Sequence, residues 1–189
     1  PHHLDFPGTI SIKDETLISL IMDIVESLFK NKLERILILN GHGGNIGILK
    51  NVLQKLKYDK NIYIATASYW DFAMKEIDNW RESKLGGINH ACEMETSLML
   101  HMQEEIVNKE NIIDNPLTRS TYTGVDLLAG GTVGVSASFK ELSAHGVIGS
   151  PSLATKEKGA DLFEIITNKI CDFIEDFSKW KKPLNGKNE

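Results

Sequence analysis

The 189-residue sequence contains only two cysteines, Cys92 and Cys171. They are too few and too far apart to form the disulfide framework of a small secreted protein, so a reducing, cytoplasmic setting is expected. A chain of this length buries on the order of 70% of the surface of its unfolded form, enough for a core without disulfides or a structural metal. Any metal is therefore expected to serve chemistry.

Long apolar runs and an excess of positive charge are also missing. No stretch approaches the roughly 18 apolar residues of a membrane span, and the first residues do not resemble a secretory signal. Lys and Arg number 21 against 26 Asp and Glu, for a net charge of −5. Binding to nucleic acid or to an anionic membrane needs a clustered positive face, so neither is the expected partner.

The apolar residues alternate between helical and strand-like spacing. Helices are predicted at 13–31, 46–57, 93–103 and 156–180, and strands at 35–40 and 61–68. This order predicts βαβ units with right-handed crossovers. Ser11 or Asp14 can cap the first helix. The apolar stripe of that helix is predicted to comprise Leu17, Leu20, Ile21, Ile24 and Leu28.

The segment 115–155 is rich in glycine and poor in long apolar side chains. Such segments are usually lids or pocket walls, although a plain surface excursion is the alternative. The polar stretch 181–189 is predicted to be a frayed tail. No internal repeat or linker divides the rest, so residues 1–189 are expected to form a single α/β domain.

The motif Asn40-Gly41-His42-Gly43-Gly44-Asn45 lies between a predicted strand and a predicted helix. Open α/β sheets bind ligands at this end of their strands. The glycines leave the imidazole of His42 uncrowded, and a neutral imidazole is a good ligand for Zn²⁺, Mn²⁺ or Fe²⁺. Two alternatives stay open, a phosphate cradle at a helix N-terminus and a structural turn. The motif matches neither a dinucleotide-binding fingerprint nor a Walker A loop.

A second cluster is His90-Ala91-Cys92-Glu93-Met94-Glu95. His90 and Glu95 can meet at one site only if His90 precedes the helix. A histidine beside carboxylates can act as a general acid or base, or a glutamate can bind metal while the histidine moves a proton. Glu93 has a simpler alternative, stabilisation of the helix N-terminus. Cys92 has no recognisable partner motif, so it is expected to be buried and inert.

Four ordered segments carry a family resemblance: 6–11 (FPGTIS), 40–45 (NGHGGN), 90–97 (HACEMETS) and 146–159 (GVIGSP through ATKEKG). They resemble the creatininase (creatinine amidohydrolase) family over nearly the whole chain. The resemblance implies a three-layer α/β/α sandwich with a mostly parallel sheet. It also implies a homo-oligomer, commonly a hexamer, that hydrolyses amide C–N bonds with two divalent metal ions.

Site residues follow from the resemblance by position. His42 is similar to a metal ligand of the family, and His90 to the residue that handles protons at the scissile bond. Glu95 matches a carboxylate close to the metals or the substrate. Gly43 and Gly44 would line the metal loop, where creatininase proper has a bulkier residue and a glutamate ligand, so creatinine is a less secure substrate.

Three further residues are expected to contact substrate. Two histidines at a chain end are by themselves typical of a tag remnant, but a histidine precedes FPGT in many relatives, so His3 is expected to be native and near the site. Trp70 can line a pocket, although an aromatic residue after a strand is usually core. Glu93 completes this set.

Three departures from the family pattern stand out. Its earliest motif, a Glu, a His and a later Asp that bridges the metals, is expected upstream of Pro1, which makes this chain N-terminally incomplete. Cys92 stands where relatives usually have Gly and could crowd the start of the helix. Ser150 stands where many relatives have Asp, which removes a carboxylate from that loop.

The expected function is that of a metal-dependent amidohydrolase of small-molecule amides or cyclic amides, in which a Zn²⁺-, Mn²⁺- or Fe²⁺-activated water attacks the carbonyl. A family deformylase or peptidase with another amide substrate is one alternative. A non-catalytic ligand- or anion-binding α/β module is the other.

Overall fold

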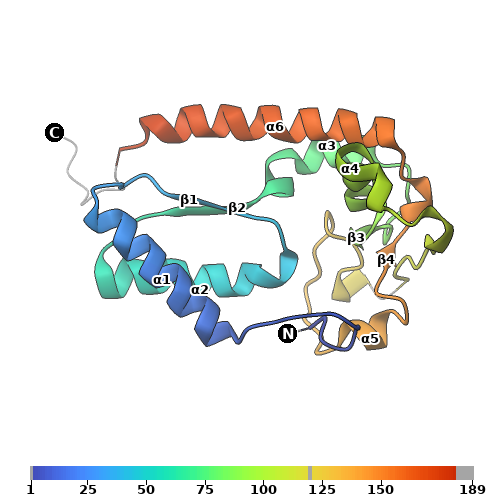
Figure 1. The fold of residues 1–189 in the computed structure, drawn as a ribbon, viewed down its shortest axis with the longest axis horizontal. Coiled ribbons are helices and arrows are strands. Elements are labelled where there is room, and N and C mark those ends of the chain that lie inside the picture. The colour runs from blue at the N-terminus through green and yellow to red at the C-terminus, as the bar shows by residue number, and fades with distance from the viewer. Residues whose placement is uncertain (1, 119–120, 182–189) are drawn as a thin grey trace. The chain divides into compact units, whose positions relative to one another are not determined.

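The computed structural model describes residues 2–118 and 121–181, and its elements are shown in Figure 1. The chain divides into two compact units. One comprises Pro1–Ile10 with Ala73–Thr167 and is called here the His90 unit; the other comprises Ser11–Phe72 with Asn168–Glu189 and is called the His42 unit. The single domain over 1–189 stays a prediction. Of the predicted tail, residues 182–189 lie outside the described residues.

The His42 unit contains a βαβ element. β1 (Leu37–Asn40), α2 (Ile46–Lys60) and β2 (Ala65–Ser68) follow one another, and β1 pairs with β2 in parallel. α1 (Asp14–Lys30) precedes them, and α6 (Lys156–Lys179) ends in this unit. Figure 1 shows α1 and α2 on one side of the strand pair and the C-terminal half of α6 on the other. The predicted order of helices and strands is confirmed, with strands shorter than the predicted ones.

The core of the His42 unit lies between α1, α2 and the strands. Its buried members are Val25, Val52, Leu56 and Ile62. The α1 residues packed against them are Ile18, Ile21, Met22 and Phe29. Leu20 and Ile24, placed in the predicted stripe, are each 50% exposed. The prediction was wrong for these two because α1 carries apolar residues around most of its circumference, and packing against α2 selects which of them are buried.

The predicted cap of α1 was also wrong. Lys13 occupies the N-cap position and makes no side-chain capping bond. The Ser11 hydroxyl donates to the carbonyl of Ile12, and Asp14 is already the first helical residue. A carboxylate in the first turn stabilises the helix through its dipole without capping it.

The His90 unit contains α3 (Met74–Trp80), β3 (Ile88–His90), α4 (Glu93–Gln103), α5 (Phe139–Leu142), β4 (Ile148–Gly149) and the start of α6. β3 and β4 pair antiparallel, with Ile88 opposite Gly149. The sequence predicts the bounds of α4 correctly. Between 115 and 155, the described residues are mostly loops and turns, as predicted, with α5 and β4 as short additions. Among all described residues, no helix is long and apolar enough to cross a membrane.

Candidate active site

The His42 loop is closed by the side chain of Asn40, the buried last residue of β1. The side-chain oxygen of Asn40, Oδ1, accepts from the His42 backbone N–H at 3.2 Å and from the Asn45 side-chain amide at 3.3 Å. The Asn40 amide donates to the His42 carbonyl at 2.8 Å and to the Ser68 hydroxyl of β2 at 3.1 Å. One buried amide thus joins both strand ends to the loop. The sequence analysis missed this role, although the place of Asn40 at the end of the strand could have indicated it.

The glycines of this loop leave space beside His42. Gly43 and Gly44 belong to a 3₁₀ turn, Gly43–Asn45, that leads into α2. A Cβ atom added at Gly41 or Gly43 would meet no atom within 4 Å. The described glycines with positive φ lie elsewhere in the chain. The glycines of this loop therefore serve to leave free space around His42, and no left-handed backbone conformation requires them there. Lining of a metal loop by Gly43 and Gly44 stays a prediction.

Trp70 follows β2 in the 3₁₀ segment Tyr69–Ala73. The residue is 4% exposed, and its ring packs edge-on against that of Tyr69 with centroids 4.8 Å apart. The Asp71 carboxylate accepts from the Ser68 N–H at 2.9 Å and holds the chain where β2 ends. The place of Trp70 in substrate binding stays a prediction.

In the His90 unit, His90 ends β3 and is surrounded by aromatic rings. The His3 ring stacks on the His90 ring with centroids 4.6 Å apart and an angle of 22° between their planes. Phe139, the first residue of α5, lies 4.2 Å from the His3 ring and 4.9 Å from the His90 ring. His2 stacks on Phe139 with centroids 5.3 Å apart and also lies 4.4 Å from the His3 ring. The sequence analysis missed Phe139, because no local pattern links the Gly-rich segment to β3.

The turn from β3 into α4 has the geometry that the sequence required. His90 precedes the helix, which starts at Glu93, and Ala91 between them has φ +47°, a left-handed conformation that a residue with a side chain rarely adopts. The Glu95 carboxylate folds back and accepts from the Ala91 N–H at 2.5 Å. Burial raises the pKa of Glu95, although hydrogen bonds from the backbone of Ala91 and Cys92 act in the opposite direction. Metal binding and catalysis by Glu95 stay predictions.

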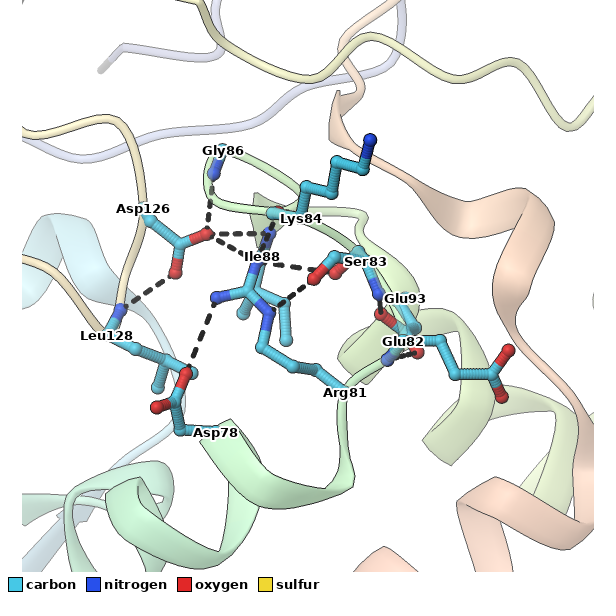
Figure 2. Close-up of polar contacts among 10 residues, drawn as sticks. All are labelled: Asp78, Arg81, Glu82, Ser83, Lys84, Gly86, Ile88, Glu93, Asp126 and Leu128. Carbon is cyan, nitrogen blue, oxygen red and sulfur yellow. Dashed lines mark hydrogen bonds and ion pairs between the residues drawn. The ribbon is translucent and has the colours of Figure 1, made fainter.

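Glu93 is fully buried and its carboxylate is engaged inside the unit (Figure 2). Its oxygens accept from the backbone N–H groups of Glu82 at 2.9 Å and Ser83 at 3.0 Å, and from the Lys158 ammonium. Burial on its own would raise the pKa of Glu93, but the bonds from Lys158, Ser83 and Glu82 outweigh it and lower the pKa. These contacts describe a structural anchor, and substrate binding by Glu93 stays a prediction.

Cys92 lies at the N-cap of α4 and is completely buried. Burial, followed by the nearby negative charge of Glu95, raises the pKa of the thiol to about 11. A thiol with such a pKa is a poor nucleophile near neutral pH. Its bulk is accommodated because Gly149 lies against it, where an added Cβ would come within 2.6 Å of the Cys92 Cβ. Cys92 therefore does not disrupt the start of the helix.

The predicted site residues are divided between the two units. His42, Gly43, Gly44 and Trp70 lie in one; His3, His90, Glu93 and Glu95 lie in the other. Among the described residues, neither unit taken by itself gathers three His, Cys, Asp or Glu ligand atoms at metal-binding distance. Each unit offers chemically suitable groups: an imidazole on an open loop in one, and an imidazole with the half-buried Glu95 carboxylate on the same turn in the other.

A parallel βαβ element with a histidine just beyond its first strand, and a second histidine at the end of β3, place the protein in the α/β class. The creatininase family model, creatinine amidohydrolase, matches residues 1–174. The chain belongs to the creatininase family.

Individual relatives give the same result. A creatinine amidohydrolase from Pseudomonas putida is 28% identical over 181 residues, which cover 90% of this chain and 66% of that protein. A mycofactocin precursor peptide peptidase from Mycolicibacterium smegmatis is 28% identical over 184 residues, covering 97% and 64%. The chain thus spans about two thirds of the length of these relatives.

Solved structures confirm the fold class. A Bacteroides fragilis protein of creatinine amidohydrolase type superposes with a TM-score of 0.80 at 25% identity, over 97% of this chain and 70% of that one. Two further matches are named for metals, "Creatininase Mn" and a Zn-Zn type of a creatininase mutant, with TM-scores of 0.69 and 0.70, each at 28% identity over 91% of this chain. The creatininase-like α/β sandwich is the fold of this protein, and divalent metals occur in its family.

Proposed function

We propose that the protein hydrolyses the C–N bond of an amide, a cyclic amide or a small peptide with the help of a divalent metal, in the manner of the creatininase family. The observation that carries the proposal is the β3–α4 junction. There Ala91 and Cys92 separate His90 from the start of α4, the His3 ring stacks on His90, and the Glu95 carboxylate folds back on the same turn. A histidine near a half-buried carboxylate is suited to move protons at a scissile bond.

His42 is the residue of the His42 unit that would hold a metal ion. Its backbone is tied at both its N–H and its carbonyl to the Asn40 side chain, so the position of the residue is set before any ligand binds. The neighbouring glycines leave room for other ligands. A bound Zn²⁺, Mn²⁺ or Fe²⁺ would polarise the amide carbonyl and lower the pKa of a coordinated water towards neutrality.

His90 and Glu95 are proposed to act on protons and charge. His90 would donate a proton to the leaving nitrogen, because an amine is a poor leaving group unless it is protonated. Glu95 would serve as a metal ligand or as a second proton-handling group, for which a pKa raised by burial is suitable. Gly43, Gly44, Trp70, Glu93 and His3 are proposed to lie around the substrate.

The proposed substrate is a small amide. The names of the two relatives indicate how widely such a substrate can vary in this family. One has creatinine, a cyclic amide, in its name, and the other a precursor peptide. Positions 43 and 44 are glycines here, whereas creatininase proper is expected to have a bulkier residue and a glutamate ligand in this loop. This difference favours a substrate other than creatinine. We further propose a cytoplasmic enzyme that works as a homo-oligomer.

The test is a comparison of the full-length wild-type protein with His42→Ala, His90→Gln and the control His101→Gln. Metal content after dialysis and hydrolysis of a panel of creatinine, formamides and short peptides are measured with added Zn²⁺, Mn²⁺ or Fe²⁺. We expect His42→Ala to lose metal, His90→Gln to keep metal but lose hydrolysis by on the order of 10²- to 10⁴-fold, and His101→Gln to change neither. Unchanged metal content in His42→Ala would remove His42 from the site.

A further inference from the structure

A buried ion pair joins Arg81 and Asp126 in the His90 unit (Figure 2). The Arg81 Nη2 lies 2.8 Å from the Asp126 Oδ2, and the two side chains are 8% and 0% exposed. Neither residue belongs to the motifs of the sequence analysis. Because removing two charges from water is costly, a buried pair persists only where further hydrogen bonds satisfy its remaining polar groups.

Most of those further bonds go to the backbone of one short stretch, 83–88, and to the loop that carries Asp126. Arg81 also donates to the Ser83 hydroxyl at 3.3 Å and forms an ion pair with Asp78 at 3.8 Å. The Asp126 Oδ2 also accepts from the N–H groups of Gly86 at 2.8 Å and Ile88 at 3.3 Å. Its other oxygen accepts from the Leu128 N–H at 3.1 Å. The next N–H along, that of Leu127, donates to the carbonyl of Ile88 at 2.7 Å. The Asp126 carboxylate thus holds the amide of Ile88, the first residue of β3, and the neighbouring Leu127 N–H holds its carbonyl.

Arg81 holds the same stretch from its other end. Its Nε donates to the Ser83 carbonyl at 2.8 Å, and its Nη2 donates to the Lys84 carbonyl. The buried Glu93 accepts the N–H groups of Glu82 and Ser83. Figure 2 shows the resulting arrangement, in which the segment 81–88 passes between two carboxylates, Asp126 on one side and Glu93 on the other.

This segment ends in β3, and β3 ends in His90. Ile88, which Asp126 holds, precedes His90 by two residues on a strand of only three. On so short a strand, a displacement at Ile88 moves the backbone of His90 with it. β4 pairs with β3 and contributes only Ile148 and Gly149, so the pairing alone offers little resistance to such a shift.

We propose that Asp126, neutralised by Arg81, is a positioning residue for His90. The pair sets where β3 begins and therefore where the imidazole of His90 lies. The proposal rests on the proposed function for its catalytic consequence, but its structural content can be measured separately. In this proposal Asp126 acts through the backbone of β3.

The substitution Asp126→Asn probes the proposal with little change of shape. Asparagine offers one acceptor oxygen in place of two, and its NH₂ group must face N–H donors on one side, either Arg81, Gly86 and Ile88 or Leu128. At least one of these bonds is lost whichever way the amide turns. Arg81→Lys is the second variant, because it keeps the charge but loses the fork that reaches the Ser83 and Lys84 carbonyls.

The first measurement is independent of activity. The ring resonances of the histidines are recorded by NMR in the full-length protein and assigned with single His→Gln variants. We expect Asp126→Asn and Arg81→Lys to shift the His90 ring signals and its pKa, and to leave those of His101 unchanged. Leu162→Ala, which removes a completely buried side chain of α6 in the same unit, is the control for lost stability and should leave His90 unchanged.

The second measurement is steady-state hydrolysis. A small misplacement of a catalytic group can cost on the order of 100-fold in rate, so we expect kcat to fall about 10- to 100-fold in Asp126→Asn, with KM much less affected and a displaced pH profile. Asp126→Glu, which keeps the charge, should recover part of the loss. If Asp126→Asn does not fold, Arg81→Lys is read in the same way.

Unmoved His90 signals in a folded Asp126→Asn or Arg81→Lys variant would overturn the positioning role, as would an equal shift in Leu162→Ala. A different outcome is that the His90 ring signals shift in these variants while the His90→Gln variant remains fully active. It would support the positioning role and remove His90 from the proposed chemistry.

Discussion

The imidazole of His3 stacks on that of His90 with ring centroids 4.6 Å apart, and Phe139 closes the group within 4.9 Å of both rings. These residues come from a terminal turn, the end of β3 and the start of α5. Three segments far apart in the chain thus meet around His90, which lies at the turn that the half-buried Glu95 carboxylate folds back on. The contact gives His3 a physical role that its terminal position alone did not suggest.

Replacement of His3 by alanine is expected to lower the rate of hydrolysis by roughly 3- to 10-fold, since an aromatic pair contributes about 0.5–1.5 kcal/mol. His3→Phe keeps a flat ring against His90 and should retain most of the rate. Steady-state kinetics of both variants in the full-length protein test this. Equal losses in the two variants would show that the imidazole itself, and not the stacked ring, is required.

Gly159 is expected to be intolerant of any side chain. A Cβ added there would lie 1.8 Å from the carbonyl oxygen of Ser97, at the place where α6 crosses α4. Gly159→Ala should therefore destabilise the protein by about 1–3 kcal/mol or more, because the two helices must move apart. Urea unfolding monitored by circular dichroism gives the value.

Gly47 provides the matched control for that substitution. It also lies in a helix, α2, but an added Cβ meets nothing within 4 Å. Gly47→Ala should leave stability unchanged or raise it by about 0.5–1 kcal/mol. If both alanine variants behaved alike, the close approach of α4 and α6 would not be the cause.

The two cysteines are expected to differ strongly in reactivity. Cys92 is buried with its pKa raised to about 11, whereas Cys171 is exposed on α6. A thiol reagent such as DTNB at pH 8 should modify one cysteine rapidly in the native protein and two in denaturant. Cys171→Ser should abolish the rapid reaction, and a fast phase that survives in this variant would contradict the buried position of Cys92.

Glu104 is expected to make stability depend on pH in the acid range. Lys109 and Lys156 donate to its two oxygens at 2.5 and 2.9 Å, and these bonds lower its pKa from 4.5 to about 2. The folded state then binds the proton more weakly than the unfolded state. The contribution is complete above pH 4.5 and is lost as the pH falls from 4.5 towards 2.

The measurement compares wild type with Glu104→Gln in urea at pH 6, 4.5 and 3. The advantage of the wild type should shrink as the pH falls, and added salt should weaken it at pH 6 because the groups are partly exposed. A difference between the two proteins that stays constant across this pH range would assign the effect of the substitution to packing.

Much of the local structure could be predicted because it depends on short-range spacing. The bounds of α4, the βαβ element and the position of His90 before a helix all follow from periodicity within windows of about 15 residues. The face of α1 that is buried could not be predicted in this way. Leu20 and Ile24 have the same helical spacing as Ile21 and Val25, and only the packing of α2 decides which pair is buried.

The sequence by itself determined the α/β alternation, the two histidine motifs and the resemblance to the creatininase family, because each resides in contiguous residues. Only the tertiary structure decided that Phe139 and His3 meet His90, and that Asp126 and Arg81 hold the strand on which His90 lies. A buried ion pair or a ring contact between distant segments leaves no periodic trace in a sequence, since it forms where loops happen to be brought together by the core beneath them.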